Sequence, residues 1–350
     1  MTAKLLSGEL ITLEAATPHA FCRRYLKTYV KEKFRPFTTV HWEDGWLLVN
    51  VHPVYKWIPL KRLDWKWLSG KSASIRLLEE NLDKVDWSIL SQNPDAISIL
   101  EKNLDKVVWA CLSANPAAIH LLEANPEKIH WRRLSTNPAA IPLLEKNLDK
   151  VNWRYLSQNP AAIHLLERNL NKVDWGWLSA NPAALPLLEK NLDNVIWSVV
   201  SFSPKAISLL EAHLDRVDWD ALSVNPAALH LLEANPERIN WSFLSQNPAA
   251  LHMLEANPEK INWSALCRNP AALSLHLLET HPQPEKIPWF FLSSYPQIIS
   301  FLDRHLDKVN WTGLSQNPAA LHLLEAYPDK IDWYCLSMNP AIFCPPLDDF

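Results

Sequence analysis

The chain has 350 residues, of which only 5 are Gly, whereas 27 are Pro and 18 are Trp. Globular proteins average about 7% Gly, so this chain is too poor in Gly for phosphate-binding Gly-rich loops, while 48% hydrophobic residues exclude wholesale disorder. The formal net charge of −4 provides no excess of positive charge for nucleic acid or an anionic membrane.

Neither a membrane span nor an ordinary secretion signal is expected. No apolar run approaches the roughly 18 residues that a membrane-spanning helix needs. Glu9 and Glu14 lie where a secretion signal would be apolar. The five Cys are scattered and form no Cys-x-x-Cys pair, which is typical of reduced thiols in an intracellular protein.

Residues 1–60 differ from the rest of the chain and predict a separate N-terminal domain. They carry eight basic and five acidic residues, a net charge of +3, whereas residues 61–350 carry −7. The segment from Phe21 to Phe34 predicts a basic helix, and residues 37–42 and 46–52 predict a β-hairpin. Two roles stay open for this small α+β domain: a cap on the repeats that follow, or a module that recruits a partner.

From residue 61 on, the chain consists of tandem repeats with a period of 22 residues. They share the pattern Ile/Val-x-Trp-x-x-Leu-Ser-x-Asn-Pro-Ala-Ala-Ile/Leu-x-Leu-Leu-Glu-x-Asn-x-Asp/Glu-Lys. Self-similarity at a fixed period predicts a repeat architecture. The thirteen structural Trp are Trp65, Trp87, Trp109, Trp131, Trp153, Trp175, Trp197, Trp219, Trp241, Trp263, Trp289, Trp311 and Trp333.

Each repeat predicts two short helices. The residue before the Trp is Asp or Asn in nine repeats, and these residue types cap helix N-termini. Helix A is therefore expected to begin at the Trp and to run for about two turns. Asn-Pro supplies the N-cap and first residue of helix B, whose Ala-Ala-Ile-x-Leu-Leu-Glu favours a helix. The residues from the next Asn to the Lys form the connector.

Packing between repeats must stabilise these helices, since isolated helices shorter than about 12–15 residues are marginal in water. We expect the Trp rings to wedge between neighbouring repeats, sealed from solvent along one continuous seam. Residues 61–343 then form an all-α solenoid of about thirteen two-helix repeats, and 344–350 form a tail. A leucine-rich repeat, which also has a fixed Asn, is the competing architecture.

Several places interrupt the pattern. The step from Trp263 to Trp289 is 26 residues long and contains the insertions Leu273-Ser274-Leu275-His276 and His281-Pro282-Gln283-Pro284, which predict a local kink. The seventh repeat has Phe202-Ser203-Pro204 in place of x-Asn-Pro. In the first repeat Gly70-Lys71-Ser72 stands there, and Pro345-Pro346 cut short helix B of the thirteenth repeat.

The repeated polar residues are expected to be structural. His recurs at one position of helix B, but equivalent positions of stacked helices lie about 8–10 Å apart. These His are therefore too far apart to bind one metal ion together, since each ligand nitrogen must lie about 2 Å from it. The Ser after the Leu suits back-bonding within helix A better than nucleophilic catalysis. The Glu of Leu-Leu-Glu and the connector Lys or Arg predict weak surface ion pairs. We expect no enzyme activity, metal or cofactor. The recurrent His of helix B are His120, His164, His230, His252, His276 and His322.

The two residues between the Trp and the Leu of helix A vary sharply from repeat to repeat, and we name these pairs the helix-A track. They include Arg, Tyr, Trp and Phe, residue types enriched in binding hot spots. Relaxed packing is the alternative explanation of the variation. The best candidates for partner binding cluster in three successive repeats: Arg132, Arg133, Arg154, Tyr155 and Trp177.

The run Leu-Ser-x-Asn-Pro-x-Ala-Ile-x-Leu-Leu-Glu-x-Asn-x-x-Lys-Ile-x-Trp, which covers roughly residues 64–343, resembles the short tandem repeats of uncharacterised proteins of large and giant DNA viruses of protists. The resemblance implies a viral protein that acts in the host cytoplasm, a viral factory or the virion. It implies no established biochemical activity.

Three functions are considered. The leading hypothesis is a non-enzymatic scaffold that binds a host or viral protein through one face of the solenoid. The second is a structural component that cements a virus particle. The third is RNA binding at one base per repeat, which the net charge of −7 over residues 61–350 disfavours.

Overall fold

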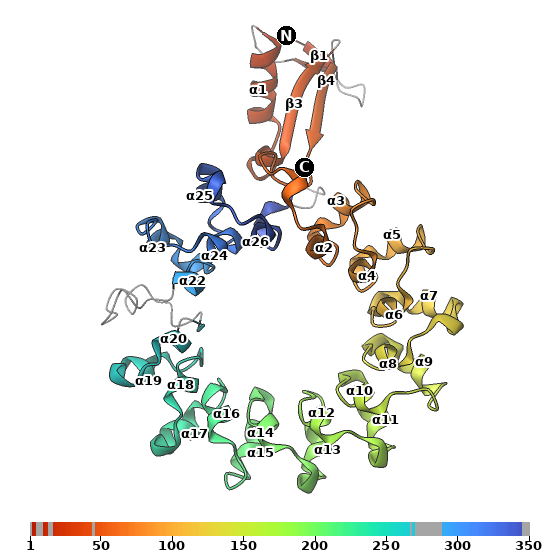
Figure 1. Ribbon diagram of the computed structural model, residues 1–350, viewed down its shortest axis with the longest axis vertical. Coiled ribbons are helices and arrows are strands. Elements are labelled where there is room, and N and C mark those ends of the chain that lie inside the picture. Colours follow the sequence, from red (N-terminus) through yellow and green to blue (C-terminus); the bar gives the residue numbers. More distant parts are fainter. Residues whose placement is uncertain are drawn as a thin grey trace. The chain divides into compact units, whose positions relative to one another are not determined.

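The computed structural model describes residues 2–4, 10–12, 17–43, 46–266, 268–269 and 289–344. Most of these residues are helical, and short helices led by Trp or Pro recur with a period of about 22 residues (Figure 1). The chain divides into two compact units, Met1–Asp86 with Trp311–Phe350, and Trp87–Asn310. Both insertions of the 26-residue step, His276 and Pro345-Pro346 lie outside the described residues. None of the described helices is long and apolar enough to cross a bilayer.

The N-terminal part of the first unit contains a helix and a small sheet. Helix α1 (Pro18–Thr28) begins earlier than predicted because Thr17 caps it and accepts a hydrogen bond from the Ala20 N–H at 3.2 Å. The 3-10 helix η1 (Glu32–Phe37) replaces the last part of the predicted basic helix.

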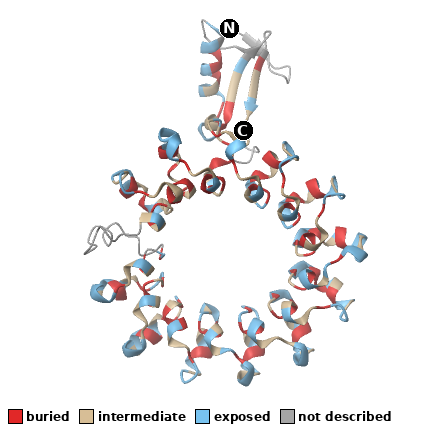
Figure 2. Cartoon of the chain, in the orientation of Figure 1, coloured by how far each residue is buried: buried red, intermediate tan, exposed pale blue. Residues whose placement is uncertain are grey.

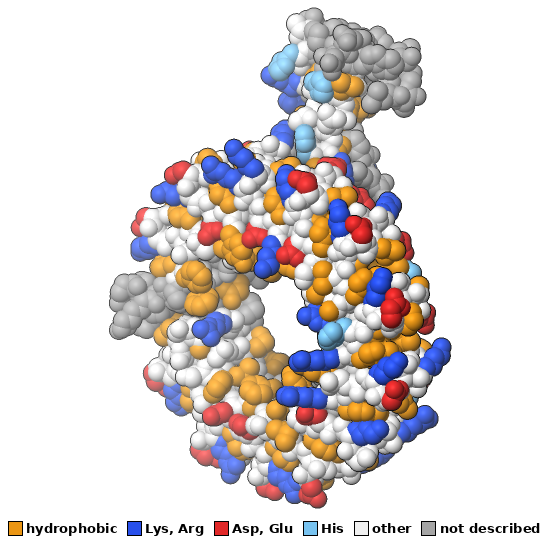
Figure 3. Space-filling view, turned by 45° about the vertical axis from the view of Figure 1, so that its right-hand side comes forward, with side chains coloured by type: hydrophobic (Ala, Val, Ile, Leu, Met, Phe, Trp, Pro, Cys, Tyr) orange, Lys and Arg blue, Asp and Glu red, His pale blue; other side chains and the backbone are white. Residues whose placement is uncertain are grey.

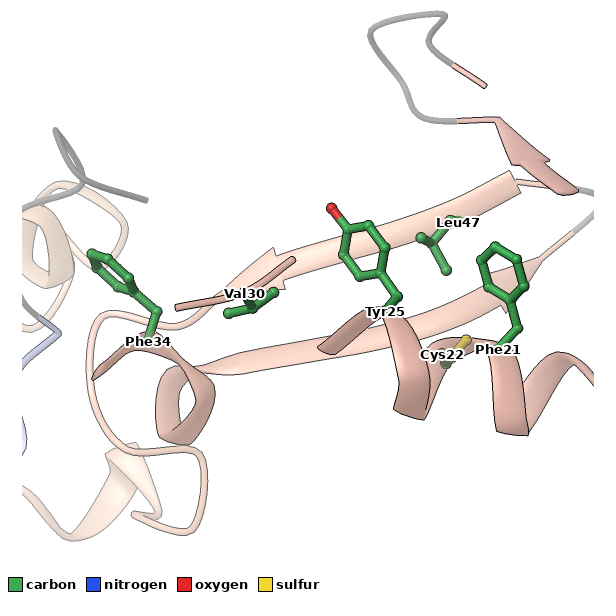
Figure 4. Close-up of a cluster of buried hydrophobic side chains, with 6 residues drawn as sticks. All are labelled: Phe21, Cys22, Tyr25, Val30, Phe34 and Leu47. Atoms are coloured by element: carbon green, nitrogen blue, oxygen red, sulfur yellow. The ribbon is translucent and has the colours of Figure 1, made fainter. Parts of the chain in front are cut away.

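The predicted hairpin is confirmed. Strand β3 (Thr38–Glu43) pairs antiparallel with β4 (Trp46–Val51), with Val40 opposite Val49. Two short strands that were not predicted, β1 (Thr2–Lys4) and β2 (Leu10–Thr12), complete a sheet of order β2-β1-β4-β3. Helix α1 packs on this hairpin, and the buried cluster of α1, the segment after it, η1 and β4 comprises Phe21, Cys22, Tyr25, Val30, Phe34 and Leu47 (Figure 4).

A helix A begins at each of the thirteen repeat Trp, but it has four to six residues, about one turn rather than two. The turn ends because the Asn N–H bonds to the Leu carbonyl three residues back, as at Asn115 and Leu112 (2.8 Å), and the next residue is Pro, which has no N–H. The helices are α2 (Trp65–Leu68), α4 (Trp87–Leu90), α6 (Trp109–Leu112), α8 (Trp131–Leu134), α10 (Trp153–Ser157), α12 (Trp175–Ser179), α14 (Trp197–Val200), α16 (Trp219–Val224), α18 (Trp241–Leu244), α20 (Trp263–Leu266), α22 (Trp289–Leu292), α24 (Trp311–Gln316) and α26 (Trp333–Ser337).

Helix B is confirmed with its predicted cap. In the third repeat the Asn115 Oδ1 accepts a hydrogen bond from the Ala117 N–H at 3.0 Å, and Pro116–Ala118 form a 3-10 turn before the α-helix starts at Ile119. The described α-helices B are α3 (Ile75–Glu79), α5 (Ile97–Glu101), α7 (Ile119–Ala124), α9 (Ile141–Glu145), α11 (Ile163–Glu167), α13 (Leu185–Glu189), α15 (Ile207–Glu211), α17 (Leu229–Ala234), α19 (Leu251–Glu255), α23 (Ile299–Asp303) and α25 (Leu321–Ala326).

The caps of helix A are also confirmed. Asp64 and Asn152 each accept a hydrogen bond from the N–H three residues on, at 2.8 and 3.2 Å, and so satisfy a donor of the first turn. In the fourth repeat His130 takes this position, and its Nδ1 accepts from the Arg133 N–H at 3.3 Å. Because helices rather than strands carry the period in the described part of the repeats, the leucine-rich alternative is not supported.

The expectation that the Trp rings are sealed from solvent is wrong. All thirteen Trp are only half-buried, and the connector cation of the same repeat lies over the ring in most of them, as Lys128 does over Trp109 at 4.5 Å and Lys150 over Trp131 at 4.9 Å. Trp therefore packs against its own connector through a cation–π contact. The connector cations were predicted to form surface ion pairs instead.

The interior of the repeats consists of small and branched apolar residues and two polar ones. Buried and exposed residues recur along the repeats (Figure 2). In the third repeat Leu112, Ala118 and Leu122 are fully buried, and so are Ser113 and Asn115. A buried polar side chain is costly unless it is hydrogen-bonded. The recurrence of Ser and Asn at these positions therefore requires partners for every copy.

The partners lie in the neighbouring repeats. The Ser135 Oγ donates to the Trp131 carbonyl at 2.9 Å, the predicted back-bond, and accepts from the Asn152 N–H of the next repeat at 3.0 Å. The Asn137 Nδ2 donates to the carbonyls of Ser113 and Asn115 in the preceding repeat, at 3.2 and 3.0 Å. Ser and Asn thus join consecutive repeats by hydrogen bonds, a role that was not predicted.

Within the first unit, the last repeat contacts the first in the same way. The Ser337 Oγ accepts from the Asp64 N–H at 2.8 Å, and the Arg62 guanidinium lies 5.1 Å from the Trp333 ring. Residues 60–64, which include the 3-10 helix η2 (Leu60–Arg62), serve as the connector of the thirteenth repeat. Beyond it, the Tyr55 N–H donates to the Ile342 carbonyl at 3.1 Å.

Candidate protein-binding surface

The candidate surface lies on helices α8, α10 and α12, which carry the track residues of the fourth, fifth and sixth repeats. Arg132, Arg133 and Arg154 are exposed, Tyr155 is half-buried, and Trp177 exposes 37% of its surface. Each lies between a Trp and a fully buried Leu, so the helix is anchored on one side and presents the track on another. All five predicted residues are therefore accessible to a partner.

Arg132, Arg133 and Tyr155 lie around one cavity of about 490 Å³, which Ala114, His130 and Thr136 also line. The Arg132 guanidinium stacks on the Tyr155 ring at 4.5 Å and donates to its hydroxyl. The Arg133 Nη1 donates to the Cys111 Sγ at 3.3 Å. Side chains of the third, fourth and fifth repeats thus form one cavity together.

Arg154 and Trp177 form a second contact along the same track. The Arg154 Nε lies 3.6 Å from the Asp174 Oδ2, and its guanidinium carbon lies 6.0 Å from the centre of the Trp177 ring. Neither residue lines the cavity. Asp174 also caps α12, so its carboxylate is shared between the helix N-terminus and Arg154.

The cavity residues Ala114, His130 and Thr136 were not identified from the sequence. His130 occupies the cap position that is Asp or Asn in nine repeats, and this departure was the available signal. Ala114 and Thr136 occupy the variable position after the recurrent Ser, outside the helix-A track. Only the packing of successive repeats shows that this position borders the track.

The His of helix B form pairs between repeats. His120, His164, His230 and His252 are exposed, as predicted, and the Nε2 of each lies 2.6–2.9 Å from the Oε1 of a Glu in the preceding repeat, for example Glu101 for His120. Within the described residues, no group of three or more His, Cys, Asp or Glu is arranged to hold a metal ion.

The cysteines of the first unit are poor nucleophiles. Burial raises the pKa of the Cys22, Cys335 and Cys344 thiols, so these groups stay protonated near neutral pH, and the thiolate is the reactive form. Cys335 also accepts a hydrogen bond from the Gln316 Nε2 at 3.2 Å.

Charge on the repeats is mixed rather than gathered in a single stripe. On the face drawn in Figure 3, Lys and Arg alternate with Asp and Glu, and apolar side chains reach the surface between them. A cluster of Arg without matching acids, as around Arg132 and Arg133, is therefore a local feature. No protein-family model, curated protein or solved structure that was compared with the chain matches it.

Proposed function

We propose that the chain is an α-solenoid scaffold that binds another protein along the helix-A track, with no chemical step of its own. The observation that carries the proposal is the cavity formed by Arg132, Arg133 and Tyr155 on two successive repeats. Arg and Tyr are the side chains that most often contribute large binding energies at interfaces. They stand on helices whose other residues are fixed by buried hydrogen bonds.

Support also comes from the separation, within each repeat, of the residues that join repeats from the residues of the track. The residues that join repeats, such as Ser135 and Asn137, are buried and recur in most repeats, whereas the track residues vary, and the five candidates among them are exposed or half-buried. A scaffold of this kind changes its binding residues without changing its fold. This combination is what a modular protein-binding surface requires.

The test is affinity capture from the native cell, with the bound proteins identified by mass spectrometry. We expect Arg133→Glu combined with Tyr155→Ala to abolish capture of the partner while lowering Tm by no more than about 2–4 °C, the equivalent of roughly 1 kcal/mol. Arg168→Glu, the same charge change at the exposed residue that caps the C-terminus of helix α11, should leave capture unchanged. Trp153→Ala should lower stability, because Trp153 packs under Lys172 at 4.8 Å.

Two outcomes would contradict the proposed binding of a protein along the helix-A track. If the double variant captures the same proteins as the parent, this track is not the interface. If the protein instead occurs in stoichiometric amounts in purified virus particles and captures nothing from the cytosol, a structural role in the particle replaces the scaffold.

A further inference from the structure

The charge of the track points to the chemistry of the partner. Among the two track residues of all thirteen repeats, only Lys66, Arg132, Arg133 and Arg154 are basic, and only Asp220 is acidic. Three of the four basic residues stand in the fourth and fifth repeats. Residues 61–350 carry a net charge of −7, so this cluster has the opposite sign to its surroundings.

The two arginines of the cavity have no carboxylate partner in the described part of the chain. No Asp or Glu oxygen there lies within 4.0 Å of Arg132 or Arg133. Arg132 is held by the Tyr155 ring and hydroxyl, and Arg133 bonds to a thiol, a weak acceptor. Most of their N–H donors therefore remain for a ligand.

The other polar groups of the cavity add donors. The His130 Nδ1 accepts from the Arg133 N–H, so the proton of the neutral ring is on Nε2, which is a donor. The Tyr155 hydroxyl accepts from Arg132 and keeps its own proton to donate. The Thr136 hydroxyl donates to the Arg133 carbonyl at 2.8 Å and is thereby occupied. A cavity rich in donors suits an anion.

We infer that this cavity binds a carboxylate side chain from an acidic segment of the partner, which rests on the protein-binding function proposed above. Arg guanidinium groups bind carboxylates by two parallel hydrogen bonds. In the sixth repeat the track exposes Trp177, which offers an apolar surface. The segment therefore carries Glu or Asp for the cavity and an apolar residue for Trp177.

The size of the cluster argues against a nucleic acid. Binding to a phosphate backbone needs a row of cations that follows the charges of the strand. In the track, the sixth and seventh repeats have Gly176, Trp177, Ser198 and Val199, and the third has Ala110 and Cys111. A cation cluster confined to two repeats fits one or two carboxylates of a polypeptide.

The test uses fluorescence anisotropy with three labelled peptides of one design. The first has two Glu followed, after a short Ser-Gly spacer, by Phe; the second has Gln in place of Glu; the third has phosphoserine there. We expect the Glu peptide to bind about tenfold or more tightly than the Gln peptide. Arg132→Gln and Arg133→Gln should each weaken the Glu peptide about tenfold, a typical loss for a hot-spot charge, whereas Arg168→Gln should not.

Two results would overturn the inference: equal binding of the Glu and Gln peptides, or detectable binding of the phosphoserine peptide alone. A peptide-display library separates this failure from failure of the proposed function. If the library yields neutral peptides whose binding is lost in Tyr155→Ala and Trp177→Ala, the track binds proteins and only the acidic assignment is wrong. If no selected peptide depends on the track, the protein-binding function fails as well.

Discussion

The junction between the fourth and fifth repeats can be compared with the junction between the last and the first repeat. In both, a buried Ser hydroxyl accepts a backbone N–H, at 3.0 Å from Asn152 to Ser135 and at 2.8 Å from Asp64 to Ser337. In both, a connector cation covers the Trp, at 4.9 Å for Lys150 and 5.1 Å for Arg62.

The junctions differ in sequence separation and in one polar contact. The first joins residues 17 apart, and the second joins residues 273 apart. The fifth repeat also contributes Asn159, which donates to Ser135 and Asn137, whereas the first repeat has Gly70-Lys71-Ser72 at that position. The comparison teaches that the same contacts can be made by local and by distant segments, and that the distant pairing costs more loop-closure entropy.

The largest expected effect comes from the buried leucines of helix A at the two places. Leu134 and Leu336 are both fully buried, and each Leu→Ala change should lower the free energy of unfolding by about 2–5 kcal/mol. Urea unfolding followed by circular dichroism measures both. If Leu336→Ala lowers the free energy of unfolding much less than Leu134→Ala does, the thirteenth repeat is not packed as the fourth is.

A smaller effect is expected from the hydroxyls of the junctions themselves. Ser135→Ala and Ser337→Ala each leave the N–H of Asn152 or Asp64 without its acceptor, and they remove the second hydrogen bond to a Trp carbonyl, at a cost of about 1–3 kcal/mol. Equal losses of unfolding free energy would show that both junctions are formed in solution. An unchanged stability for Ser337→Ala, beside a clear loss for Ser135→Ala, would show that the first and last repeats separate.

The cations over the Trp rings should contribute less to stability than the Ser hydroxyls. Lys150→Gln and Arg62→Gln each remove one cation–π contact at a partly exposed site, which is worth about 0.5–1 kcal/mol. The change in Tm of the two variants measures it. Lys102→Gln, an exposed Lys of the second repeat, serves as the control for loss of charge alone, and an equal shift in this control would show that the Trp contact contributes nothing.

The smallest effect is expected for the reaction rates of two cysteines that occupy the same position of helix A. Cys111 and Cys335 are both buried, and in single-cysteine variants both should react slowly with iodoacetamide near neutral pH. Repeats at the end of an array fray when only one side is packed. Faster labelling of Cys335 than of Cys111 would therefore show that contact with the first repeat does not hold the last one closed.

The sequence was sufficient for the starts and caps of the repeat helices, although not for the length of helix A. Asp64 or Asn152 before Trp and Asn115 before Pro act through neighbours in the chain, so their capping roles could be predicted from spacing alone. The burial of the Trp rings was predicted wrongly, because the contact of each ring with its connector was not foreseen. The residues 60–64 resemble a connector in sequence, but which repeat they complete depends on a contact with Ser337.

The candidate surface was predicted in part. Variation between repeats identified Arg132, Arg133 and Tyr155, since constant scaffold and variable surface can be separated by comparing repeats of one chain. The cavity was not predicted, because it forms where side chains of the third, fourth and fifth repeats meet. A pattern within one repeat gives no distances between repeats.

The buried hydrogen bonds of Ser and Asn have a consequence for how such a protein can change over generations. Because each repeat meets its neighbour through Ser, Asn and buried Leu that most repeats share, one repeat can replace another by recombination and still find matching donors and acceptors. New arrangements of exposed residues can then arise by exchange of whole repeats, without a fresh search for a sequence that folds.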